Sequence, residues 1–178
     1  MIHESNILDQ LSKLDIVEFS GEVYRATRKS LDPLAASTNG GRWMPKGESS
    51  VLYTSLDRDA ALAELTFHWG MLNPLPSKPA VVSRIQVSLD SSLRILRTDF
   101  PSLGINEVDY DKLNYVQMQK VGAAAAFLDC QGLIVPCARW SCENLIIFTD
   151  NLASVGIISI VDEAEVDWQR WGRENSRL

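Results

Sequence analysis

The segment "GGRWMPKGESSVLYTSLDRDAALAELTFHW", residues 40–69, decides how the middle of the chain folds. From Asp57 onward its apolar residues recur every three to four positions, which is typical of an amphipathic helix. Asp57 is a suitable N-cap for a helix over 58–69, and the β-branched and aromatic residues of 50–55 predict a strand before it. The segment therefore predicts a glycine-rich loop, a strand and a helix in succession.

Glu64 occupies an unusual position in this helix. On a wheel with about 100° between residues, the apolar side chains cover an arc of roughly 220° that includes Glu64. The apolar members are Ala60, Ala61, Leu62, Leu65, Phe67 and Trp69. Asp59 and Thr66 mark the opposite face, which we expect to be solvated. A buried carboxylate is costly unless it is paired or hydrogen-bonded, so the position of Glu64 on the inner face needs an explanation.

Two interpretations of Glu64 are open. In the first, Glu64 forms a structural ion pair with Arg25, Arg58 or Arg84 and orders the core. In the second, the helix lines a ligand-binding cleft. His68 follows one turn later on the same face, where a packing role is the more common one for a single histidine.

The surrounding residues favour the cleft. Arg25 lies within a predicted strand over 21–27, Arg42 follows two glycines, and Tyr53 closes the strand before the helix. Guanidinium groups bind phosphates, a tyrosine ring stacks on a flat heterocycle, and a carboxylate stabilises an oxocarbenium-like transition state. No second carboxylate pairs with Glu64 in the sequence, which suits a leaving group that needs no general acid, such as nicotinamide. These residues predict cleavage of an N-glycosidic bond.

The rest of the chain predicts an α+β fold. We expect helices over 5–14, with Ser5 as N-cap, and over 109–128. We expect further strands over 80–89, 92–97, 132–139, 144–150 and 156–166, a proline-rich loop over 73–79, and a tail that ends in a fraying helical turn. Since short strands are interrupted by only two substantial helices, a doubly wound parallel sheet fits poorly and short mixed or antiparallel strands are expected.

Composition narrows the function classes. The 178 residues are 46% hydrophobic and 22% charged, as in one compact soluble domain. The net charge of −6 argues against direct nucleic-acid binding. The absence of a long apolar segment or a signal peptide leads us to expect a cytoplasmic protein with no membrane contact. Two histidines and three cysteines without CxxC spacing predict no metal site.

Several short motifs together resemble the RES domain in their order and spacing. They are "YRA" (24–26), "GGRW" (40–43), "LYTS" (52–55), "AALAE" (60–64), "VPCAR" (135–139) and Asn144. The RES domain is the toxin of the bacterial RES–Xre toxin–antitoxin systems. The resemblance covers about residues 20–160. It implies a single RES domain over 1–178, with an N-terminal helix in 1–19 and a strand end and tail in 161–178.

The resemblance implies a fold like that of ADP-ribosyltransferase toxins and an enzyme that depletes NAD. Such an enzyme requires no cofactor, and NAD is its substrate. It releases nicotinamide by hydrolysis, by phosphorolysis with inorganic phosphate as co-substrate, or by transfer of ADP-ribose to a protein. The implied partner is an Xre-type antitoxin, in a hetero-oligomer of toxin and antitoxin. A non-catalytic interaction module is the alternative of a different class.

The resemblance also implies roles for individual residues. Glu64 matches the catalytic glutamate, Arg25 and Arg42 match the arginines that bind the pyrophosphate and ribose of NAD, and Tyr53 matches the aromatic residue of the nicotinamide site. Arg25 and Tyr53 therefore belong to the expected catalytic group as well. The remaining residues expected at the NAD site are Ser55, Cys137, Arg139 and Asn144.

Position 137 departs from the RES pattern, which usually has serine after the proline. A thiol is a weaker hydrogen-bond donor than a hydroxyl, so activity falls or changes in preference if Cys137 touches the ligand or orients Glu64. We do not expect Cys137 to be a catalytic nucleophile. The one internal histidine, His68, shares a helix with Glu64 and is a poor partner for it.

Overall fold

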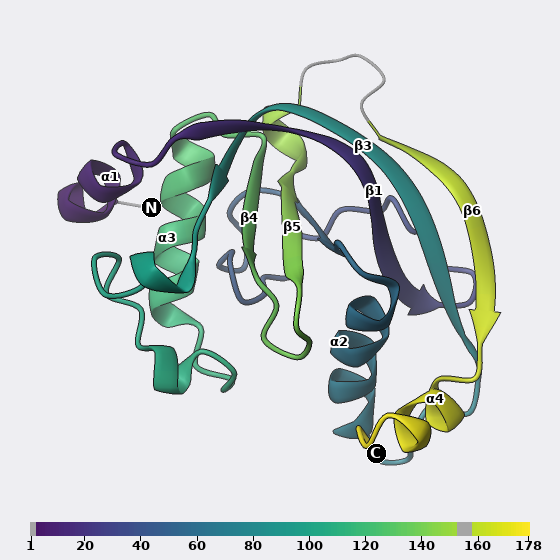
Figure 1. The fold of residues 1–178 in the computed structure, drawn as a ribbon. Coiled ribbons are helices and arrows are strands. Elements are labelled where there is room, and N and C mark those ends of the chain that lie inside the picture. Colours follow the sequence, from purple (N-terminus) through teal and green to yellow (C-terminus); the bar gives the residue numbers. More distant parts are fainter. Residues whose placement is uncertain (1–2, 153–157) are drawn as a thin grey trace.

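The structure of the protein is a computed structural model that describes residues 3–152 and 158–178. Within these residues the chain forms four α-helices and a six-stranded sheet (Figure 1). The helices are α1 (Ser5–Leu11), α2 (Arg58–Gly70), α3 (Val116–Phe127) and α4 (Trp168–Glu174). The strands are β1 (Ile16–Arg28), β2 (Val51–Ser55), β3 (Ala80–Arg94), β4 (Gly132–Pro136), β5 (Glu143–Phe148) and β6 (Ile158–Val166). Short 3₁₀-helices cover Arg97–Asp99, Glu107–Asp109 and Thr149–Asn151.

The sheet is mixed and curves back on itself. Its strand order is β1-β2-β5-β4-β3-β6, and β1 also pairs with β3, from Ile16 opposite Leu93 to Arg28 opposite Ala80. Every strand pair is antiparallel except β3 with β4. In Figure 1, β1 and β3 form a long arch over the shorter β4 and β5. The predicted α+β class with mixed short strands is confirmed.

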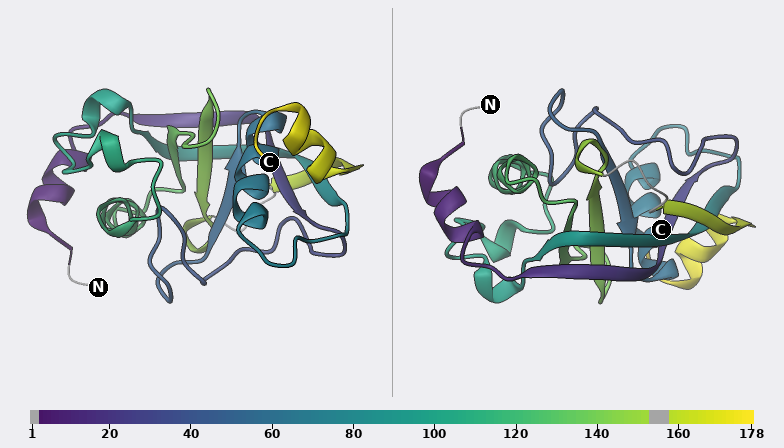
Figure 2. Two further views of the ribbon diagram at one scale, coloured as in Figure 1. Left: turned by 90° about the horizontal axis from the view of Figure 1, so that it is seen from below. Right: turned by 90° about the horizontal axis from the view of Figure 1, so that it is seen from above.

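Helices α3 and α2 lie on the two flanks of β4 and β5. Figure 2 shows α1 beside α3 at one end of the molecule and α4 beside α2 at the other. The largest apolar cluster lies between α3 and the sheet, and its biggest fully buried side chains are Trp43, Phe100, Tyr110 and Phe148. None of the helices in the described ranges is long and apolar enough to cross a membrane.

Close packing of α3 fixes the loop that carries Arg42. A methyl group on Gly122 would lie 1.7 Å from the carbonyl oxygen of Trp43, so the helix backbone itself touches the loop. Gln119, one turn earlier, donates a hydrogen bond to the carbonyl oxygen of Gly41 at 2.8 Å. The run of small residues after Gly122 allows this approach.

Several predicted boundaries are wrong. The cap of α1 is Glu4, and Ser5 is already helical. The expected helix over 109–128 begins only at Val116. The strands expected over 80–89 and 92–97 form one strand up to Arg94, because pairing with β1 resumes at Ser92 after an irregularity between Val17 and Phe19. Of the strand expected over 156–166, residues 156 and 157 lie outside the described part.

The C-terminal tail, expected as a fraying turn, contains the packed helix α4. In α4, Trp168 and Trp171 are only 1% and 9% exposed. The indole nitrogen of Trp171 donates to the Asp59 carboxylate at 3.0 Å. Thr66, which the wheel placed on a solvated face, is fully buried next to Gly172. The prediction failed because α4, from the far end of the sequence, covers this face of α2.

Candidate active site

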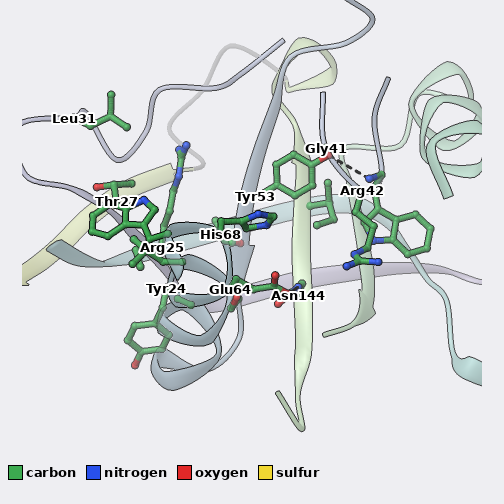
Figure 3. Close-up of a pocket in the computed structure, with 18 of the residues that line it drawn as sticks. Tyr24, Arg25, Thr27, Leu31, Gly41, Arg42, Tyr53, Glu64, His68 and Asn144 are labelled. Carbon is green, nitrogen blue, oxygen red and sulfur yellow. Dashed lines mark hydrogen bonds between the residues drawn. The ribbon is translucent and has the colours of Figure 1, made fainter. Parts of the chain in front are cut away.

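A pocket of about 510 Å³ opens between α2, β1, β2 and the glycine-rich loop (Figure 3). Its volume falls in the range of small-molecule sites. Most of the predicted site residues line it, namely Arg25, Arg42, Tyr53, Ser55, Glu64 and Asn144. Cys137 and Arg139 do not line it. The structure thus brings together residues from five separate segments of the sequence.

Glu64 projects into the pocket from the middle of α2. Its Oε1 atom accepts hydrogen bonds from the Cys137 thiol at 3.4 Å and from the Asn144 amide at 3.5 Å. Within the described part of the chain, Oε2 has no hydrogen-bond partner and the carboxylate forms no ion pair. One carboxylate oxygen is therefore held by the protein while the other is available to a ligand.

The interpretation of Glu64 as a structural ion pair is wrong for the described residues. Arg58 and Arg84 each pair with a different carboxylate, at 3.5 and 2.8 Å. Arg25 donates to backbone carbonyls instead. Glu64 acts electrostatically on Arg139, whose pKa burial lowers and Glu64 raises. Glu64 faces inward because α2 lines a cleft at this position.

Arg25 lies at one side of the pocket. Its Nη1 atom donates to the carbonyl oxygens of Pro33 and Ala35 at 2.7 and 2.9 Å. Burial lowers the pKa of Arg25, and the nearby Asp32 raises it. An arginine stays protonated under such shifts. Because Arg25 forms no ion pair with a described residue, its charge can serve an anionic ligand.

Arg42 lies on the opposite side of Glu64 and His68 (Figure 3). Its Nη1 atom donates to the carbonyl oxygens of Tyr110 and, at 3.3 Å, of Lys112. The guanidinium lies over the ring of Tyr115, 4.6 Å from its centroid. The segment that leads into α3 therefore fixes this second cation. Arg42, too, forms no ion pair with a described residue.

The two glycines before Arg42 are required by the geometry of the loop. Gly40 has φ +81°, a conformation that favours glycine. A methyl group on Gly41 would lie 2.6 Å from the hydroxyl of Tyr53. That hydroxyl accepts a hydrogen bond from the backbone N–H of Trp43 at 3.3 Å, drawn as a dashed line in Figure 3. Loop and tyrosine thus hold each other in place.

Burial keeps the phenol of Tyr53 neutral. It raises the pKa of Tyr53 to about 12, although hydrogen bonds from the loop backbone and the charge of Arg42 lower it. At neutral pH the side chain therefore offers the pocket an uncharged ring. Such a ring can stack on a flat heterocycle.

Sequence reasoning left His68 out of the site, yet it lines the pocket one turn after Glu64. Burial lowers the pKa of His68, Glu64 raises it, and the cations Arg139 and Arg42 lower it. The imidazole is therefore neutral at pH 7. Its spacing from Glu64 was a signal that could have found it. For Tyr115, which also lines the pocket, the sequence carried no comparable signal.

Cys137 and Arg139 lie behind the pocket wall. Cys137 is buried and touches Glu64 through its thiol. The guanidinium carbon of Arg139 lies 3.5 Å from the centroid of the Phe67 ring, and its Nε and Nη2 atoms have no hydrogen-bond partner among the described residues. Burial lowers the pKa of Arg139. Cys137 thus positions the carboxylate, and Arg139 adds positive charge nearby.

A sequence model of the RES domain matches residues 22–169. The chain belongs to the RES domain family. This RES domain is similar in structure to a chain of the M. tuberculosis MbcT–MbcA toxin–antitoxin complex, with a TM-score of 0.82 over 98% of each chain. The identity is 19%, so the similarity is one of fold. No curated protein sequence matches the chain.

The chemistry open to this RES domain site depends on charge and hydrogen bonding. Among the residues that the structure describes, no group of three or more His, Cys, Asp and Glu side chains could hold a metal ion. The pocket is lined by three arginines (Arg25, Arg28 and Arg42), the neutral phenol of Tyr53, the neutral imidazole of His68 and one carboxylate. Such a site can bind an anionic ligand and stabilise positive charge that develops beside Glu64.

Proposed function

We propose that this RES domain is the toxin of a bacterial toxin–antitoxin system and cleaves the nicotinamide–ribose bond of NAD. One observation carries the proposal. Glu64 presents a free carboxylate oxygen to a pocket that has an arginine without an ion pair on either side. The overall resemblance to a chain of a toxin–antitoxin complex supports the toxin role.

The two arginines are suited to the pyrophosphate of NAD. Their hydrogen bonds to backbone carbonyls all use Nη1. The Nε and Nη2 atoms of Arg25 and Arg42 have no hydrogen-bond partner among the described residues and are free for phosphate oxygens. Arginine binds phosphate in this bidentate manner. The carbonyl contacts hold the guanidinium groups before the ligand arrives, which reduces the entropy lost on binding.

Glu64 would act on the ribose. As the bond to nicotinamide breaks, positive charge develops on the sugar, and the free Oε2 atom stabilises it electrostatically. Nicotinamide leaves as a neutral molecule, so no general acid is needed. The neutral ring of Tyr53 would stack on the nicotinamide. The acceptor that completes the reaction is water, inorganic phosphate or a protein side chain.

The test is the loss of NAD over time with purified protein, with and without added phosphate. We expect Glu64→Gln, which keeps the shape and removes the charge, to lower turnover by about two to three orders of magnitude. Glu18→Gln is the matched control, because Glu18 is exposed in β1 and outside the pocket. Phosphate-dependent loss identifies a phosphorylase, and phosphate-independent loss a hydrolase.

Labelled NAD separates the remaining functions. Label that enters protein identifies an ADP-ribosyltransferase. NAD that stays intact under all these conditions contradicts the proposed enzyme and leaves a binding module. Equal turnover in the Glu64→Gln and wild-type proteins would contradict the role of the carboxylate.

A further inference from the structure

Cys137 and Cys142 face each other across the hairpin that joins β4 to β5. The last strand pair is Pro136 with Glu143, and the backbone N–H of Cys137 donates to the carbonyl oxygen of Cys142 at 2.9 Å. Directly opposed residues project to the same face of the hairpin. Their Cα atoms lie about 5.5 Å apart in such a hydrogen-bonded pair, a separation that a disulfide spans. Both thiols are free.

The two thiols differ in acidity because their side chains interact. The Cys142 thiol donates to the carbonyl oxygen of Glu143 at 3.3 Å. The interaction between the two side chains lowers the pKa of Cys137 and raises that of Cys142, whereas burial and Glu64 raise the pKa of Cys137. The backbone N–H of Arg139 also donates to the Cys137 sulfur, at 3.4 Å. The thiolate is the reactive form of cysteine. Cys137 is thus the more acidic thiol of the pair but is buried, and Cys142 is partly exposed.

The same Cys137 thiol holds Glu64. It donates its hydrogen to Oε1 of Glu64 at 3.4 Å, and the only other donor to this carboxylate in the described chain is Asn144 at 3.5 Å. A disulfide at Cys137 has no hydrogen to donate. Oxidation would therefore remove one of the two hydrogen bonds that orient the carboxylate.

We propose that Cys137 and Cys142 form an oxidation site for hydrogen peroxide, and that the resulting disulfide lowers the activity of Glu64. The Cys137 thiolate attacks one peroxide oxygen, the O–O bond breaks, and the released hydroxide takes up a proton to become water. Cys142 then attacks the sulfenic sulfur of Cys137, the S–S bond forms, and the S–O bond breaks with loss of a second water. The thiols lose two electrons and the peroxide gains them.

The first arm of the test is chemical and independent of any enzyme activity. Full-length reduced protein is treated with one equivalent of peroxide, and peptides are mapped by mass spectrometry without reduction. We expect a linked Cys137–Cys142 peptide in wild type and in Cys130→Ser, and its disappearance after dithiothreitol. Cys142→Ser should give no intramolecular link. A missing link in wild type, or a link through Cys130, overturns the proposal.

The second arm rests on the proposed NAD cleavage. We expect kcat to fall about fivefold in the linked protein while KM changes little, because Arg25 and Arg42 keep their contacts. Dithiothreitol should restore kcat, and reduced Cys142→Ser should be as active as wild type. Linked protein with unchanged kcat overturns the regulatory part. If reduced wild type fails to cleave NAD, the proposed function fails, while peptide mapping still decides the disulfide.

Discussion

Glu64 is held by two weak donors and by no cation in the described structure. A carboxylate held in this way depends on the quality of each donor. The Cys137 thiol is the weaker donor type, since sulfur forms longer and weaker hydrogen bonds than a hydroxyl. At the residue scale, the orientation of one carboxylate is therefore the property most sensitive to substitution.

Cys137→Ser tests this sensitivity. A hydroxyl at position 137 gives Oε1 of Glu64 a stronger donor, so we expect NAD turnover to rise by a factor of about two to five. Thermal unfolding should change little, because serine fits the volume of cysteine. Steady-state turnover of reduced protein is the measurement. A fall in turnover without a loss of stability would show that the thiol has another role.

His68 provides a test of the charges around the pocket. We expect an NMR titration of its ring protons to give a pKa below the ordinary value of about 6.5, because burial opposes protonation. Glu64 raises this pKa, so Glu64→Gln should lower it further. A midpoint at or above the ordinary value would contradict the described environment. Glu18→Gln serves as control and should leave the midpoint unchanged.

At the scale of elements, α2 packs against α4 as well as against the sheet. Trp171 packs against Leu62 and Ala63 and donates to Asp59. We expect Trp171→Ala to destabilise the fold by about 3 kcal/mol, as for other large-to-small core substitutions. Trp171→Phe keeps most of the packing and should cost about 1 kcal/mol through the lost hydrogen bond. Denaturant unfolding measures both.

A similar loss of stability in the two Trp171 variants would show that packing is not the main contribution of Trp171 to the stability of the fold. An unchanged unfolding midpoint in Trp171→Ala would show that α4 contributes nothing to the position of α2.

The sequence predicted α2 well because its signals are local. Asp57 caps the helix through hydrogen bonds from the N–H groups of Asp59 and Ala60, as expected from its side chain. The 3.6-residue period also placed Glu64 on the inner face. Thr66 was misplaced because the helix that covers it lies about a hundred residues later, and periodicity within one segment contains no information about such a partner.

The residues of the site were likewise predictable only where their signals are local. Arg42 was found because two glycines mark its loop. Tyr53 was found because it belongs to a locally predicted strand, although it lies in the middle of β2 and not at its end. The contact between Cys137 and Glu64 depends on the register of β4 with β5 and on the placement of α2. Neither follows from the sequence near either residue. The wheel could therefore show that Glu64 faces inward, but not which side chains would hold it.

At the scale of the whole molecule, the proposed toxin role predicts growth arrest. We expect expression of the wild-type chain in bacteria to deplete cellular NAD and stop growth, and Glu64→Gln to be tolerated. Glu18→Gln should be as toxic as wild type. Co-expression of a cognate antitoxin should restore both NAD and growth. Growth arrest by Glu64→Gln at equal expression would contradict NAD cleavage as the cause.

The contact between Gly122 and Trp43 couples the position of α3 to the loop that carries Arg42. Because backbone touches backbone there, no side chain can absorb a small shift of the helix. Gln119, one turn earlier in α3, donates a hydrogen bond to the same loop. We therefore expect a movement of α3 to shift the loop that carries Arg42. Mutations on the outer surface of this helix would alter NAD affinity while every ligand-binding residue stays intact.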